Sequence, residues 1–348
     1  MLQVNNQGIC RQFRRQNMPL SQFRALKDKT REVLRGATAS KIVLSAVIMA
    51  TSIAPVLGQE CQMTRAFMQP DANTRTGATA VWSTTDRSAL FFIESLNVNT
   101  DGTRRSYSVD DFWGQRTALN NLCNAMSDAC AGLANAGLSN RRLVTQRAYA
   151  EGWPAALLAQ TRISPSIIPF KGGKPCPAVS GYLVSATALH KPNISDVCDI
   201  ANYVDALNVP ALVLPRDPRG GRSGFSTRGA DVGDLVVAML PGSTSPVYAV
   251  VGDKGPVNQL GEASVALNGK LLGKTAPPIN YDEVRGRGQF AGRGWMVPRA
   301  LVLVFPATRD TGTPFMTTER IDESARMRFE AWGGVARLTA CAREYARR

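Results

Sequence analysis

The feature that most constrains the fold is a series of short apolar runs, separated by turns rich in glycine and proline. Runs this short are typical of buried strands, because helices usually need ten or more residues. They are Leu90–Ile93, Tyr182–Ala188, Val209–Pro215, Leu235–Leu240, Val247–Val251 and Ala300–Phe305. Pro241 and Gly242 separate two of the runs and predict a hairpin there. Many short strands predict a mainly β or α+β fold, with a barrel-like β core and peripheral helices.

Helical patterns are fewer. Apolar residues recur at helical spacing between Ile321 and Trp332, and Gly333 then favours a helix end. A second helix is expected to begin within 119–126, where apolar residues are again spaced by three or four. The segment 139–175 is polar and then punctuated by proline and glycine. It predicts a surface excursion, not a domain boundary.

The first 58 residues resemble a targeting segment. They contain nine basic and two acidic residues, and the segment ends in the apolar run Ile42–Leu57. A basic stretch followed by an apolar stretch and small residues is typical of an export signal, so we expect cleavage near Gly58. An uncleaved signal-anchor is the alternative and the only membrane contact expected. Residues 59–88 lack periodicity and predict a flexible lead-in, which leaves 89–348 as the catalytic domain.

The cysteines agree with export. The chain has seven: Cys10, Cys61, Cys123, Cys130, Cys176, Cys198 and Cys341. Cys10 lies in the targeting segment, and the remaining six, an even number, predict disulfides in a secreted or periplasmic protein. Fifteen pairings are possible, and the sequence does not select one. No pair has the C-x-x-C spacing of zinc sites, so neither a metal nor a cofactor is expected.

The charge balance indicates no nucleic-acid partner. The net charge is +14, and half of it belongs to the first 58 residues. The remaining basic residues are scattered, with no basic stripe interleaved with aromatic residues. The segment 281–294 is rich in arginine and glycine, and its part Gly286–Gly294 resembles RNA-binding segments of the RGG type, but a loop of a folded domain is favoured.

Two carboxylates carry the candidate chemistry. Asp253 follows the predicted strand Val247–Val251, and Glu262 opens the next element after a turn at Gly255. If those elements lie side by side, both carboxyls emerge at one end of the sheet. Glycoside hydrolysis needs such a pair, one as acid and one as base or nucleophile. It requires no histidine, which fits a chain whose only histidine is His190. Alternatively, Glu262 is a simple helix-start carboxylate.

The segments Val250–Pro256 and Gly261–Leu267 resemble the signature of the glycoside hydrolase family 75 chitosanases. Further similar segments follow the family's order, and the similarity extends from about Leu90 to Cys341. They are Thr100–Gly102 with Tyr107, Gly181–Leu189, Val209–Pro215 and Gly233–Asp234. The resemblance implies an endo-acting hydrolase of β-linked amino-sugar polymers that inverts the anomeric centre.

The resemblance also implies residue roles. Asp253 and Glu262 correspond to the catalytic pair, with Glu262 favoured as the acid and Asp253 as the base. Asp101, Tyr107 and Asp234 correspond to positions that contribute to substrate binding, although turn formation explains both aspartates equally well. The expected partner is therefore a polysaccharide such as chitosan.

Two features depart from the family pattern: the loop between Asp253 and Glu262 is shorter than in the fungal members, and the N-terminal signature has fewer aspartates. The second departure and the net charge affect the expected substrate. Asn97 and Asn99 stand where more aspartates are expected, and the chain beyond residue 58 carries a net charge of +7. Both weaken attraction to chitosan, a polycation. A neutral or anionic amino-sugar polymer, including peptidoglycan, is the alternative substrate. A non-catalytic glycan- or cell-wall-binding protein is the alternative function, and it predicts that Asp253 and Glu262 lie apart or buried.

Overall fold

The computed structural model describes residues 60–71 and 77–345. They belong to one unit, Val56–Arg348. The expected targeting segment, residues 1–58, lies outside the described residues, so export and cleavage remain predictions. Within the described residues, no helix is both long and apolar enough to cross a membrane.

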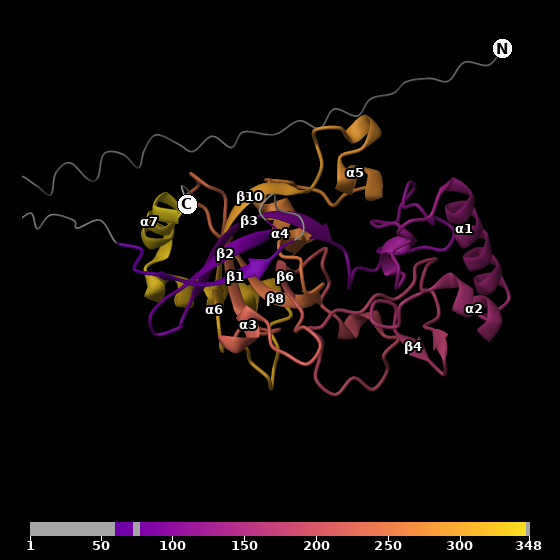
Figure 1. Ribbon diagram of the computed structural model, residues 1–348, viewed down its shortest axis with the longest axis horizontal. Coiled ribbons are helices and arrows are strands. Elements are labelled where there is room, and N and C mark those ends of the chain that lie inside the picture. Colours follow the sequence, from indigo (N-terminus) through magenta and orange to yellow (C-terminus); the bar gives the residue numbers. More distant parts are fainter. Residues whose placement is uncertain (1–59, 72–76, 346–348) are drawn as a thin grey trace, which may run out of the picture. The chain divides into compact units, whose positions relative to one another are not determined.

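Within the part of the chain described, six strands close into a barrel, as predicted (Figure 1). They are β3 (Leu90–Asn99), β6 (Ala211–Pro215), β7 (Leu235–Met239), β8 (Val247–Gly255), β9 (Glu262–Ser264) and β10 (Val297–Phe305). The order around the barrel is β3, β10, β7, β8, β6 and β9, and β9 returns to β3. The pairs β6–β8 and β3–β9 are parallel and the others antiparallel. β7 and β8 form the predicted hairpin.

The segment 59–88 is not a flexible lead-in, and that prediction is wrong. It contributes β1 (Thr64–Pro70) and β2 (Ala78–Ser83), which extend the sheet outward from β3. Val81 and Trp82 are buried, so the segment forms part of the core. The folded domain therefore begins before β1, not at residue 89.

Alternating strand residues divide into two apolar layers. One set fills the barrel, and Leu212, Val236 and Val251 belong to it. The other set faces outward and packs against α6 (Thr318–Trp332) and α7 (Gly334–Tyr345). The predicted C-terminal helix is α6, and it ends at Gly333, whose φ of 124° suits glycine. The sequence did not predict α7, which begins at the next residue.

A lobe with its own apolar cluster is inserted between β3 and β6 (Figure 1). Its regular elements are α1 (Asn135–Ala150), α2 (Ala155–Thr161), β4 (Phe170–Lys171), β5 (Lys174–Pro175) and two 3-10 helices, Leu122–Ala125 and Ile200–Asn202. The segment 139–175 is thus a folded part of the lobe, not a simple excursion. The helix expected within 119–126 is a single 3-10 turn. The predicted strand Tyr182–Ala188 is wrong, because only isolated bridges occur there.

Two shorter helices lie next to barrel strands in the chain. α4 (Val265–Leu271) continues directly from β9, and α3 (Gly224–Thr227) lies between β6 and β7. The arginine- and glycine-rich segment expected as a loop contains α5 (Tyr281–Arg285) and a 3-10 turn, Gly288–Phe290.

Three disulfides join all six cysteines of the described residues, which confirms that prediction. They are Cys61–Cys341, Cys123–Cys130 and Cys176–Cys198. The first ties the chain before β1 to α7, and the other two lie within the lobe. Disulfides of this kind are typical of proteins in oxidising compartments.

Candidate active site

A β-bulge at Gly252 decides where Asp253 points. Leu212 pairs with Val251, whereas the next residue, Val213, pairs with Asp253, so β8 has one extra residue at this point. Side chains alternate along a regular strand, and Asp253 would then share the barrel interior with Val251. The bulge reverses that alternation and directs Asp253 outward. Gly252 is required there, because a Cβ atom at this position would lie 2.6 Å from the Cβ atom of Ala211.

Val213 brings the two predicted catalytic residues onto one face of the sheet. It pairs with Asp253 of β8 on one side and with Glu262 of β9 on the other. Residues directly opposite each other on paired strands point to the same face. The Cα atoms of Asp253 and Glu262 are therefore two strand spacings apart, roughly 9.5 Å. Glu262 reaches back toward β8, since its Oε2 atom lies 3.6 Å from the Cβ position built on Gly255.

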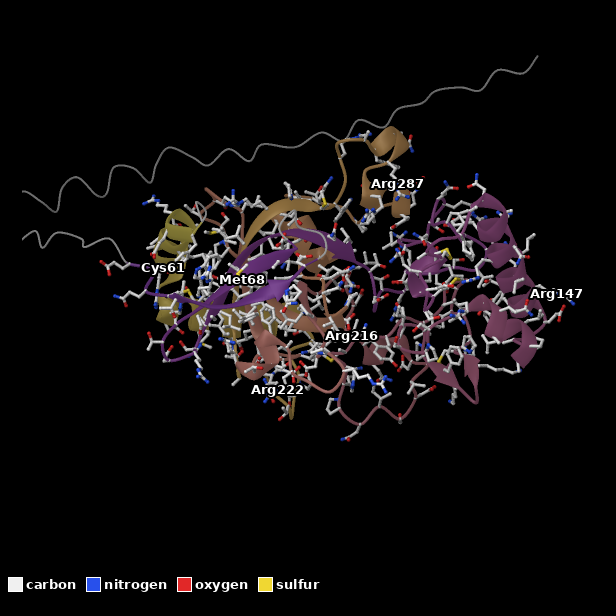
Figure 2. All side chains as sticks on the ribbon, in the orientation of Figure 1. Cys61, Met68, Arg147, Arg216, Arg222 and Arg287 are labelled. Carbon is white, nitrogen blue, oxygen red and sulfur yellow. A yellow bond between two sulfur atoms is a disulfide. The ribbon has the colours of Figure 1, made fainter. Side chains whose placement is uncertain are left out.

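Both carboxyls line a cavity of about 580 Å³ between the barrel, the lobe and α5. The barrel side supplies the ends of β3 and β8, and the lobe supplies Tyr107 and Asn120. Besides Asp253 and Glu262, its polar lining residues are Asn97, Asn99, Thr100, Asp101, Tyr107, Asn120, Asn124, Ser166, Arg216, Lys254, Gln259, Tyr281 and Arg285. Figure 2 labels Arg216 on the barrel side of this region, near the lobe.

N–H groups hold the Asp253 carboxylate. Its Oδ1 atom accepts hydrogen bonds from the backbone N–H of Ala188 at 2.9 Å and of Lys254 at 2.8 Å. Its Oδ2 atom accepts one from Asn99 Nδ2 at 3.4 Å. Burial raises the pKa of Asp253, and these donors oppose that shift because they stabilise the charged form. The donors therefore favour the charged form of Asp253, although burial still leaves its pKa above the ordinary value.

Glu262 has the opposite environment. Burial and, second, the nearby charge of Asp253 raise the pKa of Glu262 to about 7, and no donor from the described residues offsets them. The carboxyl keeps some contact with solvent at the cavity while protein encloses the rest of it. Glu262 therefore holds a proton at neutral pH more readily than an ordinary glutamate. Two carboxyls with opposed environments are the usual basis for acid and base roles.

Asp101 and Tyr107 lie in the same cavity, as the sequence predicted. Burial, followed by the charge of Asp253, raises the pKa of Asp101 well above its usual range. The Tyr107 hydroxyl interacts with Asp101 and accepts a hydrogen bond from Asn120 Nδ2 at 3.3 Å. Asp101 Oδ1 is buried and has no hydrogen-bond partner among the described residues. Asp101 thus favours its neutral form next to the Asp253 anion.

Asp234 does not line the cavity, and its predicted role in substrate binding is wrong. The side chain is 0% exposed. Its carboxylate accepts backbone N–H groups from Asp231, Thr308 and Arg309 at 2.8–2.9 Å and pairs with the Arg309 guanidinium at 3.2 Å. Asp234 therefore fixes the turn that follows β10.

His190 also lies outside the cavity. Its Nδ1 atom is 2.8 Å from the carbonyl oxygen of Lys191, and the side chain is exposed. No group of three or more potential metal ligands occurs in residues 60–71 and 77–345.

Sequence reasoning missed several residues of the cavity. Asn99 was treated only as a departure from a family pattern, yet it bonds Asp253 and accepts the backbone N–H of Asp101 at 2.6 Å. Arg216 gave no sequence signal, and Tyr281 and Arg285, both on α5, belong to the arginine- and glycine-rich segment that was expected to be only a loop.

Comparisons with known proteins add no name to this site. A scan against protein-family models found no match for the chain. A search of the curated proteins likewise found no significant relative.

Proposed function

We propose that this protein is a glycoside hydrolase that cleaves β-linked amino-sugar polymers with inversion at the anomeric carbon. The observation that carries the proposal is the pairing of Val213 with both Asp253 and Glu262, which puts two carboxyls of opposed environment on one face and in one cavity. The resemblance to the family 75 chitosanases supports the same two residues.

Glu262 is the proposed general acid. With a pKa of about 7, it holds a proton near neutral pH and can deliver it to the glycosidic oxygen as the bond to the anomeric carbon breaks. The leaving sugar then departs as a neutral alcohol, and Glu262 becomes a carboxylate.

Asp253 is the proposed general base. Its N–H donors favour the ionised form and fix its orientation. It accepts a proton from a water molecule whose oxygen attacks the anomeric carbon on the face opposite the leaving group. The configuration at that carbon is inverted.

The family resemblance favours inversion over retention, and the distance between the two carboxyls is the feature that distinguishes these mechanisms. Inverting enzymes separate their carboxyls by about 6.5–9.5 Å to admit a water molecule, whereas retaining enzymes need about 5–5.5 Å. Asp253 and Glu262 are on strands separated by β6, so Val213 lies between them.

The extent of the cavity supports a polymeric substrate. A second cavity of about 350 Å³ adjoins the first and shares Asn124, Ala129 and Tyr281 with it. The shared residues join the two cavities into a path that continues from the catalytic pair to the region between the lobe and α5, as a chain-like substrate requires. The disulfides support the accompanying proposal that the enzyme is secreted or periplasmic.

Release of reducing ends from soluble chitin, chitosan and peptidoglycan tests this function. We expect wild type to hydrolyse at least one of them, and Asp253→Asn and Glu262→Gln each to lower turnover by about 10²–10⁴-fold. Glu323→Gln is the matched control, because Glu323 is an exposed carboxylate on α6, outside both cavities. Near-normal turnover in either cavity variant contradicts the assigned roles, and a product with retained configuration in NMR contradicts inversion.

A further inference from the structure

Three arginines line the two adjoining cavities from different elements. Arg216 and Arg285 line the larger cavity, and Arg287 lines the smaller one. None of the three forms an ion pair with a described residue. Arginines elsewhere in the described chain do find carboxylates, as Arg141 does with Asp128 and Arg309 with Asp234. The cavities therefore collect guanidinium groups that make no direct ion pair, although the charge of Arg216 lies near enough to Asp253 to oppose the rise that burial causes in the pKa of that carboxyl.

Two of the three arginines, Arg216 and Arg287, are held in place by contacts that leave their charge available. Arg216 donates from Nε to the carbonyl oxygen of Gly255 at 2.9 Å, which anchors it two residues beyond Asp253. The Arg287 guanidinium stacks over the ring of Tyr281, with its carbon 5.4 Å from the centroid. Arg285 is exposed in the last turn of α5. Guanidinium groups held in this way suit carboxylate ligands, which they bind through paired N–H donors.

The carboxyls of the same cavities do not balance these charges. Burial raises the pKa of Asp101, Glu262 and Asp253 and so favours their protonated forms, and only for Asp253 do N–H donors oppose that shift. Asp282 adds a carboxylate to the smaller cavity, and Lys254 is already paired with Asp231 at 2.9 Å. A polycation entering this path would meet unpaired arginines, whereas a polyanion would neutralise them.

We infer that the substrate is an acidic polymer of amino sugars, in which carboxylate groups on the chain bind Arg216 and Arg285 in the cavity that holds the catalytic pair. This inference rests on the proposed hydrolase function and specifies its substrate class. Arg216 and Arg285 are specificity-determining residues in this assignment. Arg287 provides a further binding position for a carboxylate of the polymer in the smaller cavity.

Three soluble polymers with one backbone test the charge selection: carboxymethyl chitin is anionic, glycol chitin neutral and chitosan cationic. We expect kcat/KM to be highest for carboxymethyl chitin and lowest for chitosan, with the anionic preference shrinking at high salt because screening weakens exposed charge pairs. Equal or better hydrolysis of chitosan overturns the inference and leaves the hydrolase function standing.

Variants assign the preference to residues. Arg216→Gln and Arg285→Gln should each reduce the ratio of kcat/KM for carboxymethyl over glycol chitin by about tenfold, which corresponds to the loss of one charge-assisted contact. Arg219→Gln removes the same charge from an exposed position three residues beyond Arg216, outside both cavities, and should leave the ratio unchanged. An equal loss on both polymers indicates a structural role and overturns the assignment.

Binding separates this inference from the hydrolase proposal. The affinity of Glu262→Gln for the three polymers can be measured without turnover, by affinity electrophoresis. If wild type hydrolyses none of them while the variant still prefers the anionic polymer, the hydrolase proposal fails and charge selection holds. Equal affinity for all three polymers overturns charge selection, whether or not hydrolysis occurs.

Discussion

Asn99 links the proposed base to the rest of the cavity: its Nδ2 atom donates to Asp253 Oδ2 at 3.4 Å. Its Oδ1 atom accepts the backbone N–H of Asp101 at 2.6 Å, so one amide joins the end of β3 to the base. An aspartate at position 99 could not donate and would add a negative charge beside Asp253. The Asn99 amide therefore favours the ionised form of Asp253 and helps to orient its carboxylate.

The first prediction follows from Asn99 and its neighbour Asn97, which pairs with Glu262 between β3 and β9. Asn99→Asp should raise the pKa of Asp253, because a like charge disfavours the anion. Since the base must be ionised, the acid side of the pH–rate profile should move upward. Asn97→Asp should instead act mainly on Glu262, which must be protonated, and should move the alkaline side upward. Both variants moving the same side by equal amounts would falsify this division of roles.

The second prediction concerns stability and needs no substrate. The pKa of Glu262 is raised to about 7 in the folded state from an ordinary value of 4.5, so the folded protein binds more protons between these values. Its free energy of unfolding must then fall as pH rises through this window. A shift of this size corresponds to a cost of about 3 kcal/mol above neutral pH. Glutamine at position 262 cannot ionise and avoids that cost.

Urea unfolding of wild type and Glu262→Gln at several pH values measures this effect. The variant should gain stability relative to wild type by up to about 3 kcal/mol between pH 4 and pH 8. Glu323→Gln, at an exposed position on α6, should show no such trend. A constant difference between Glu262→Gln and wild type across the range contradicts the raised pKa.

The sequence predicted most barrel strands, since their apolar runs are fully buried and short. The sequence-based prediction of strands failed where polar side chains, and not a neighbouring strand, form the hydrogen bonds with the backbone. In the segment Tyr182–Ala188, Ser185 Oγ accepts the backbone N–H of Gly102, and Thr187 Oγ1 accepts that of Val204. These contacts satisfy the neighbouring backbone without a sheet, and a pattern of apolar residues does not reveal them.

The candidate site was predicted only in part, for a similar reason. Gly233–Asp234 and Gly252–Asp253 look alike in sequence, yet N–H groups of Thr308 and Arg309, more than seventy positions away, enclose Asp234. A period of two along β8 would have placed Asp253 inside the barrel, and only the bulge corrects this. Both outcomes depend on long-range contacts, which local patterns do not encode.

The third prediction concerns the disulfides. Cys61–Cys341 spans 280 positions and Cys123–Cys130 only 7, so the first restricts the unfolded chain far more. On the chain-entropy model, replacing both cysteines by alanine should cost about 5 kcal/mol for the first bridge and about 2 kcal/mol for the second. Urea unfolding of the two double variants measures the difference. Titration of the denatured, unreduced chain from residue 59 should find no free thiol, and two or more free thiols contradict the pairing.

The last prediction tests the bulge that directs Asp253. A Cβ atom at position 252 would lie 2.6 Å from the Cβ atom of Ala211, so Gly252→Ala must either strain the β6–β8 pair or remove the bulge. We expect a loss of about 1–3 kcal/mol in stability and a larger proportional loss of activity, because Asp253 would leave its N–H donors. Gly221→Ala, at an exposed glycine without a left-handed φ, should be nearly neutral.

A second substitution distinguishes this steric cause from a general loss of glycine flexibility. Ala211→Gly removes the atom that the new Cβ would strike, so Ala211→Gly combined with Gly252→Ala should recover much of the stability and turnover lost in Gly252→Ala alone. Recovery measured by unfolding and by kcat would follow from the contact between these two positions, which belong to neighbouring strands. If the stability changes of the two single variants simply add in the double variant, the contact between positions 211 and 252 does not determine the bulge. The orientation of Asp253 then has another cause.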